Sequence, residues 1–173
     1  MIKTTLLGFL LTGLLFTSSL FAQDNAAGGL GAPGCGSPDT TFDVKTVTGQ
    51  HPAQPEAGKA VVYFIQDDSA FITRPRPTTR MGMDGEWVGA THSNSYLYFS
   101  VNPGVHHICA SWQGWNQEVG AAHFTAEAGG VYYFEAKNSY WNGSTSIRLN
   151  PLDSDEGQLL LNRFSFSTSR PKK

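Results

Sequence analysis

The sequence predicts an all-β fold, namely an antiparallel β-sandwich or a partly open barrel of about seven to nine short strands with one short C-terminal helix. Short segments rich in aromatic and β-branched residues recur from residue 59 onward, and such segments are typical of strands. Turns that contain Gly, Pro or Asp-Gly separate them at short intervals, which favours repeated reversals of the chain. With 173 residues, the chain is expected to form one domain of ordinary size.

The N-terminal 22 residues have the pattern of a secretory signal peptide. Lys3 supplies a short positive region, residues 6–16 form an apolar run, and Ala22 precedes the polar Gln23. The run is shorter than the roughly 18 to 20 residues that span a bilayer. We therefore expect cleavage after Ala22, no transmembrane segment in the mature chain, and a periplasmic or extracellular location.

The chain contains two cysteines, Cys35 and Cys109. An exported chain with an even number of cysteines is a candidate for a disulfide. Closing so long a loop would stabilise the fold by about 4 kcal/mol in the chain-entropy model. The alternative is a pair of unpaired thiols, with Cys109 buried in a strand. A lipid anchor is not expected, because Cys35 lies well past the end of the apolar run.

Residues 23–58 are predicted to form a flexible leader, because Gly and Pro are frequent at both of its ends. Within this leader, residues 41–48 alternate in polarity and are predicted to form an edge strand. The sandwich domain is expected from 59 to 168, followed by a basic tail at 169–173. Its first strand, 60–65, is continuously apolar, which is typical of a central strand buried on both faces.

Three pairs of extended segments follow, and each pair is predicted to form a hairpin around a turn. The turns lie at 84–85, 102–104 and 127–130. The segments that they join are 81–83 with 86–89, 96–101 with 105–112, and 121–126 with 131–136.

The C-terminal part is predicted to contain one more strand at 144–149 and then the single helix, at 155–161. Ser154 is the expected N-cap of this helix, and acidic residues in the first turn favour it. Gly157 is unfavourable within it. Residues 164–167 are predicted to form a last edge strand.

Short motifs follow one another in a fixed order between Gly58 and Leu161. They are Lys59-Ala60-Val61-Val62-Tyr63-Phe64, Met83-Asp84-Gly85, Val88-Gly89, Val101-Asn102-Pro103-Gly104-Val105-His106, Ala126-Glu127-Ala128-Gly129, Val131-Tyr132-Tyr133-Phe134 and Asp155-Glu156-Gly157. With this order of motifs the chain resembles a bacterial family known as domain of unknown function 2846. The family has no established activity, so the resemblance implies a fold and a location outside the cytoplasm but no functional residue. Some members look like lipoproteins, and this chain departs from them because it lacks a lipidation cysteine.

No metal site is predicted. His106 and His107 are adjacent on a strand and point to opposite faces, so they cannot share one ion, whereas His107 and Cys109 could. Further ligands would have to come from distant residues, namely His51, His92 or His123. Residues 153–157 partly match a calcium loop, but the glycine falls one place early, so a helix start is the better interpretation.

No catalytic function or cofactor is predicted. The sequence contains no Gly-x-Ser-x-Gly elbow, phosphate loop or His-Glu-x-x-His motif, and Asp67 and Asp68 have no partner acid that the sequence identifies. The alternative is a secreted hydrolase with a site assembled from dispersed Ser, His and Asp, which would require a group with a perturbed pKa in a sizeable pocket. A net charge of −2 without a basic stripe argues against a nucleic-acid partner.

Four aromatic residues lie in or beside loops that contain Gly and Asn: Trp112, Trp115, Tyr140 and Trp141. Such rings offer large, rigid surfaces for binding another envelope protein or a glycan. The alternative is that Trp112 belongs to the core and the others anchor their loops. We therefore expect an exported, non-enzymatic β-sandwich module with a binding or structural role in the envelope, with contacts through 112–116 and 138–143.

Overall fold

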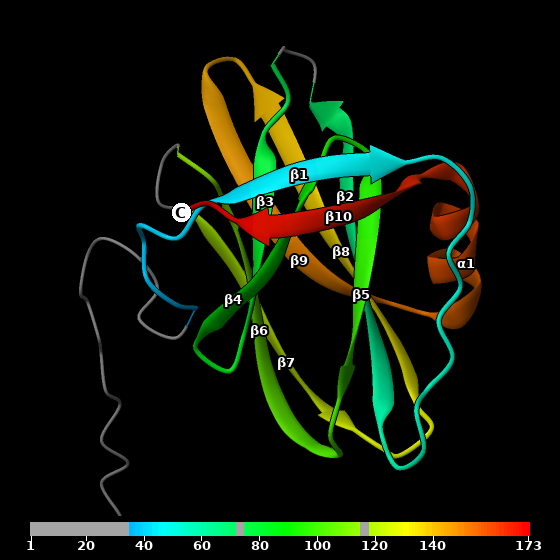
Figure 1. The fold of residues 1–173 in the computed structure, drawn as a ribbon. Helices are drawn as coiled ribbons and strands as arrows, with labels where there is room; N and C mark the ends of the chain where they lie inside the picture. The colour runs from blue at the N-terminus through cyan, green and yellow to red at the C-terminus, as the bar shows by residue number, and fades with distance from the viewer. Residues whose placement is uncertain (1–34, 72–74, 115–117) are drawn as a thin grey trace, which may run out of the picture.

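The computed structural model describes residues 35–71, 75–114 and 118–173, so the signal peptide expected at 1–22 lies outside the described residues. These ranges form a mostly β fold of two packed sheets that do not close into a barrel, which confirms the predicted fold class (Figure 1). Within them there are ten strands, more than the expected seven to nine, and one helix. The elements are β1 (Phe42–Val47), β2 (Ala60–Phe71), β3 (Thr78–Met83), β4 (Glu86–His92), β5 (Ser95–Val101), β6 (Gly104–Trp112), β7 (Val119–Ala126), β8 (Val131–Trp141), β9 (Ser144–Leu152), α1 (Ser154–Arg163) and β10 (Ser165–Pro171).

The larger sheet has six strands in the order β1-β10-β5-β2-β8-β9, and the smaller has four in the order β4-β3-β6-β7 (Figure 1). Most neighbouring strands are antiparallel, as expected, but β2 with β8 and β5 with β10 are parallel. β8 is parallel to β2 because the chain returns from the smaller sheet beside β2 in the same direction, whereas β10 reaches β5 from β9 of the same sheet through α1. The structure is therefore a sandwich with mixed pairing.

The long strand β2 is buried on both faces, as its apolar run predicts. Its even-numbered residues, such as Val62 and Phe64, lie in the main core between the sheets. Its odd-numbered residues, such as Tyr63, belong to a second cluster on the outer face of the larger sheet. This second cluster is covered by Leu160 and Leu161 of α1. The helix thus shields an apolar part of the sheet that would otherwise face water.

Two of the three predicted hairpins are wrong. The turn at 84–85 does join β3 to β4 as predicted, with Asp84 and Gly85 both at positive φ. The turns at 102–104 and 127–130 instead carry the chain from one sheet to the other, because β5 and β6, and likewise β7 and β8, lie in different sheets. Both sides of β5 are already paired, with β2 and with β10, so no edge remains for β6.

The first and last strands of the described residues pair with each other at one edge of the larger sheet. The strand expected at 41–48 is present as β1 and is an edge strand, as predicted. The last strand, expected as an edge at 164–167, instead lies between β1 and β5. Because β1 pairs with β10 along its whole length, the part of the expected flexible leader that contains β1 is integrated into the sandwich.

The helix begins one residue earlier than expected. Its N-cap is Asp153, not Ser154, because the Asp153 carboxylate accepts a hydrogen bond of 2.8 Å from the backbone N–H of Glu156. The Ser154 hydroxyl instead accepts a bond of 2.9 Å from the amide of Gln158. A carboxylate at this position also interacts favourably with the N-terminal end of the helix dipole.

Gly157 is the point at which α1 contacts the sheet. A Cβ atom built on Gly157 would lie 2.3 Å from Cγ of Tyr133, at the base of that ring. The sequence marked Gly157 as a weakness of the helix, but the structure requires a residue without a side chain there.

We expect Gly157→Ala to lower the free energy of unfolding by about 1–3 kcal/mol, because overpacking outweighs the higher helix propensity of alanine. Urea denaturation measures the change. Leu159→Ala is the matched control on the same helix: Leu159 is 55% exposed, and its loss should change stability by less than about 0.5 kcal/mol. A Gly157→Ala variant as stable as the wild type would contradict the close packing of α1 on Tyr133.

Candidate functional site

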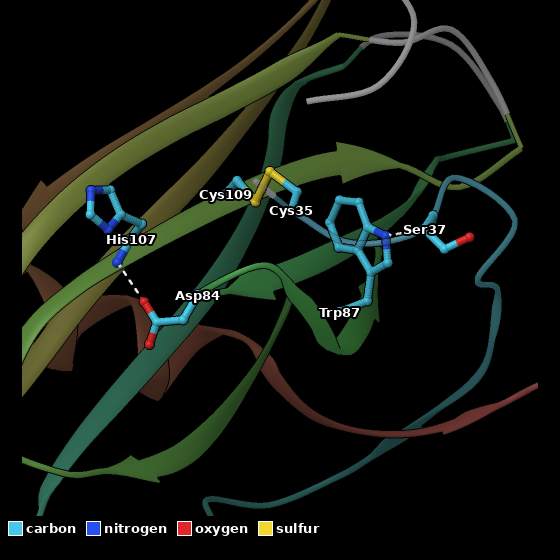
Figure 2. Close-up of a disulfide and its surroundings, with 6 residues drawn as sticks. All are labelled: Cys35, Ser37, Asp84, Trp87, His107 and Cys109. Atoms are coloured by element: carbon cyan, nitrogen blue, oxygen red, sulfur yellow. Dashed lines mark hydrogen bonds between the residues drawn. A yellow bond between two sulfur atoms is a disulfide. The ribbon is translucent and has the colours of Figure 1, made fainter. Parts of the chain in front are cut away.

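The two cysteines form a disulfide that attaches the N-terminal segment to the smaller sheet (Figure 2). Cys35 and Cys109 of β6 are joined by an S–S bond of 2.01 Å, with their Cα atoms 6.0 Å apart. Both residues are buried. The alternative of two unpaired thiols is therefore wrong, and the sulfur of Cys109 is not available to a metal ion.

The residues after Cys35 are hydrogen-bonded to the same smaller sheet. The indole N–H of Trp87 donates to the carbonyl oxygen of Ser37 at 2.8 Å (Figure 2). The guanidinium of Arg80 donates to the carbonyl oxygens of Pro38 and Thr40 at 2.8 and 2.9 Å. The same guanidinium lies 4.4 Å from the centre of the Trp87 ring, a cation–π contact. One disulfide and three hydrogen bonds thus direct the chain from Cys35 into β1.

His106 forms an ion pair, not a metal ligand set. Its Nδ1 lies 2.6 Å from Oδ2 of Asp84, and its Nε2 lies 2.8 Å from the carbonyl oxygen of Asn102. Both partners are acceptors, so both ring nitrogens must donate, which only the protonated imidazolium can do. The other carboxylate oxygen of Asp84 accepts from the backbone N–H of His107 at 2.9 Å (Figure 2). Among the described residues, no three His, Cys, Asp or Glu side chains are placed to hold a metal ion.

The contacts of this pair shift both pKa values. Burial alone would lower the pKa of His106, but its bonds to Asp84 and Asn102 outweigh burial and raise that pKa above the ordinary 6.5. Burial alone would raise the pKa of Asp84, but the bonds from His106 and His107 lower that pKa below 3.8. The imidazolium contribution to stability is complete below pH 6.5 and is lost as pH rises through the raised pKa. The carboxylate contribution is complete above pH 3.8 and is lost as pH falls.

We expect the stability difference between the wild type and His106→Gln to be largest between about pH 4 and pH 6.5 and to shrink as the solution becomes alkaline. Urea denaturation midpoints measured at pH 5.5 and at pH 9 test this. Val105→Ala, at an exposed position of the same strand β6 and without a titratable group, is the control and should show no such dependence. An equal loss at both pH values would mean that His106 stabilises the fold without its charge.

The four aromatic candidates do not form one surface. Trp112 is 1% exposed and lies in the core, where its indole N–H donates to Oδ1 of Asn138 at 2.8 Å. This is the core position that stood as the alternative to a binding role. Tyr140 is half-buried and packs against Phe71, with ring centres 5.8 Å apart. Trp115 lies outside the described residues.

Trp141 is 75% exposed, the largest exposed fraction of any large hydrophobic residue in the described part of the chain. It ends β8 and is followed by Asn142 and Gly143, both at positive φ, which turn the chain tightly into β9. The Asn-Gly dipeptide is the local sequence signal for the hairpin of β8 and β9. Trp141 therefore lies close to the tip of the β8–β9 hairpin.

Polar side chains accompany Trp141 on the outer face of the larger sheet. Ser139 lies opposite Ser146, with their hydroxyl oxygens 2.6 Å apart, and Lys137 lies opposite Arg148. Alternation along the strands places these side chains on the same face as Trp141. The exposed Arg148 lies on this face opposite Lys137, four residues along β9 from Ser144, which is the pair partner of Trp141.

The structure supplies Asp67 with the partner acid that the sequence could not identify. The ammonium group of Lys137 lies 2.7 Å from Asp67 and 3.4 Å from Glu135. Burial raises the pKa of Glu135, and the neighbouring Asp67 adds to the increase. Burial would also raise the pKa of Asp67, but its bonds to Lys137 and Ser69 lower it instead. Two acids with divergent pKa values can serve in acid–base catalysis. Here, however, Lys137 forms ion pairs with both carboxylates, which is typical of a structural ion-pair network.

Asp68 has a structural position in the interior. Its carboxylate accepts from the side-chain amides of Asn138 at 2.7 Å and of Gln66 at 2.9 Å. Gln66 in turn accepts a bond of 2.8 Å from the Thr91 hydroxyl. Burial raises the pKa of Asp68. The network links both sheets through polar groups that water does not reach.

A family model described as a protein of unknown function (DUF2846) matches residues 56–147, more than half of the chain. A comparison with curated proteins finds no match. None of the helical structure in the described ranges has the length and apolar character that a membrane span requires.

Proposed function

We propose that this chain, which belongs to the DUF2846 family, is an exported, non-enzymatic β-sandwich module that binds another component of the cell envelope through the β8–β9 hairpin. One observation carries the binding role: Trp141 is 75% exposed on a tight hairpin. Burying such a ring against a partner would remove a large apolar surface from water, and Trp is among the residues that contribute most to binding energy at interfaces.

The disulfide supports the proposed location. Structural disulfides form and persist in oxidising compartments and are rare in the cytoplasm. The Cys35–Cys109 bond agrees with the signal-peptide pattern of residues 1–22, an independent feature of the sequence.

The polar surroundings of Trp141 support a partner with hydrogen-bonding groups. Ser139 and Ser146 lie next to the ring along the hairpin, and Arg148 carries an exposed positive charge. An aromatic anchor with nearby hydroxyls and a cation is suited to an envelope glycan or to a protein surface with acidic groups.

The test is retention of the protein in the envelope fraction of its producing cell. We expect Trp141→Ala to release most of the protein into the soluble fraction without changing its stability, since the ring makes few contacts within the fold. Leu159→Ala, another exposed apolar residue, is the matched control and should be retained like the wild type. Equal retention of Trp141→Ala and wild type would overturn the proposal.

A further inference from the structure

A pocket of about 330 Å³ lies on the outer face of the larger sheet, beside α1. Its floor consists of three tyrosines from three neighbouring strands, namely Tyr63 of β2, Tyr96 of β5 and Tyr133 of β8. One wall is α1, and the other is the segment between β1 and β2, which runs past the helix in Figure 1. The volume is at the lower end of the range for small-molecule sites, which suits one ring-sized ligand.

The segment between β1 and β2, which forms the wall opposite the helix, is hydrogen-bonded to the tyrosines of the floor. The hydroxyl of Tyr96 accepts a bond of 2.9 Å from the backbone N–H of His51, and that of Tyr63 accepts one of 2.6 Å from Ala53. Gln50 donates a bond of 2.5 Å to Asn162 of α1, which joins the two walls. The pocket is therefore formed before any ligand enters, and binding would cost little reorganisation.

Hydrogen-bonding groups without partners remain around this floor. Neither the hydroxyl of Tyr133 nor the side-chain amide of Gln54 forms a hydrogen bond within the described residues, and Gln158 uses only one of its amide hydrogens, toward Ser154. The Tyr133 ring stacks on Tyr63, with ring centres 5.2 Å apart and planes 7° from parallel, so its orientation is fixed. An aromatic floor with several neutral donors and acceptors is thus available to a ligand.

The charge of the lining restricts the ligand class. Among the described residues, none that lines this pocket carries a charged side chain: the polar members are carboxamides and phenols. An ionic ligand would lose hydration without finding a counter-charge, and a purely apolar ligand would leave the carboxamides unpaired. A sugar ring meets both conditions, because its C–H face packs on aromatic rings while its hydroxyls both donate and accept hydrogen bonds.

We propose that this pocket, lined by Tyr63, Tyr96 and Tyr133, is a binding site for one uncharged sugar ring, either free or at the end of a glycan. It is separate from the Trp141 hairpin, and the two sites can be disabled independently.

The test is titration of the mature protein with the methyl glycosides of glucose, galactose, mannose and N-acetylglucosamine. Binding is monitored by calorimetry and by ¹H–¹⁵N NMR. At least one of these sugars should bind saturably and shift the amide signals of Val131, Tyr133 and Gln158. Tyr133→Phe and Gln158→Ala should each weaken binding by about three- to tenfold, the effect of one lost hydrogen bond. Leu159→Ala, at an exposed position of α1 that does not line the pocket, is the matched control and should bind as the wild type does.

Four results would overturn the proposal. In the first, none of the four glycosides binds. In the second, indole binds in the pocket while the sugars do not, which would make it an apolar site. In the third, glucuronate or glucosamine binds as tightly as the matching neutral sugar. In the fourth, the sugar-induced shifts map to Trp141 instead of Tyr133.

Discussion

Replacing both Cys35 and Cys109 with serine should lower the free energy of unfolding by about 4 kcal/mol. The bond closes a loop between residues 74 positions apart, and a cross-link of that span removes much of the conformational freedom of the unfolded chain. The same change should release residues 35–40 from the smaller sheet, since the other bonds that hold them there are three hydrogen bonds donated by Arg80 and Trp87.

Guanidinium denaturation of the wild type with and without reductant, beside the double variant, measures this effect. Reductant should destabilise the wild type to the level of the variant and leave the variant itself unchanged. Equal stability of all three samples would show that the disulfide does not constrain the fold.

Trp112→Ala should lower the free energy of unfolding by about 3–5 kcal/mol, the usual cost of removing a large aromatic side chain from a core. Trp112 packs edge-on against Phe71, with ring centres 5.7 Å apart. Trp112→Phe keeps much of this packing but leaves Oδ1 of Asn138 buried without its donor, and should cost roughly 1–3 kcal/mol.

Trp141→Ala is the control for this pair, because it removes the same side chain from an exposed position and should change stability by less than about 0.5 kcal/mol. Urea denaturation of the three variants under one set of conditions gives the comparison. Similar losses for Trp112→Ala and Trp141→Ala would contradict the placement of Trp112 in the core and Trp141 at the surface.

The sequence predicted the positions of the strands better than it predicted which strands pair with each other. The apolar run of β2 and the Asp-Gly turn between β3 and β4 are local signals, and both led to correct predictions. Whether the turns at 102–104 and 127–130 make hairpins depends on which strand edges are free in the assembled sheets. No local pattern contains that information, so both were assigned incorrectly.

The same distinction applies to the candidate site. The disulfide was predictable because the chain contains only two cysteines. The contact of Asp67 with Lys137 joins residues 70 positions apart and had no sequence signal. Trp112 could have been assigned to the core, because Ile108, Ala110 and Trp112 alternate along one face of β6.

Intact mass of the protein recovered from the envelope and medium of its producing cell, with and without reductant and alkylating agent, tests the central claim of an exported, disulfide-linked module most directly. We predict a chain that begins at Gln23, lighter than the thiol form by the two hydrogens lost in the Cys35–Cys109 bond, and alkylated only after reduction. A chain that begins at Met1 with two thiols open to alkylation would contradict both the export and the disulfide.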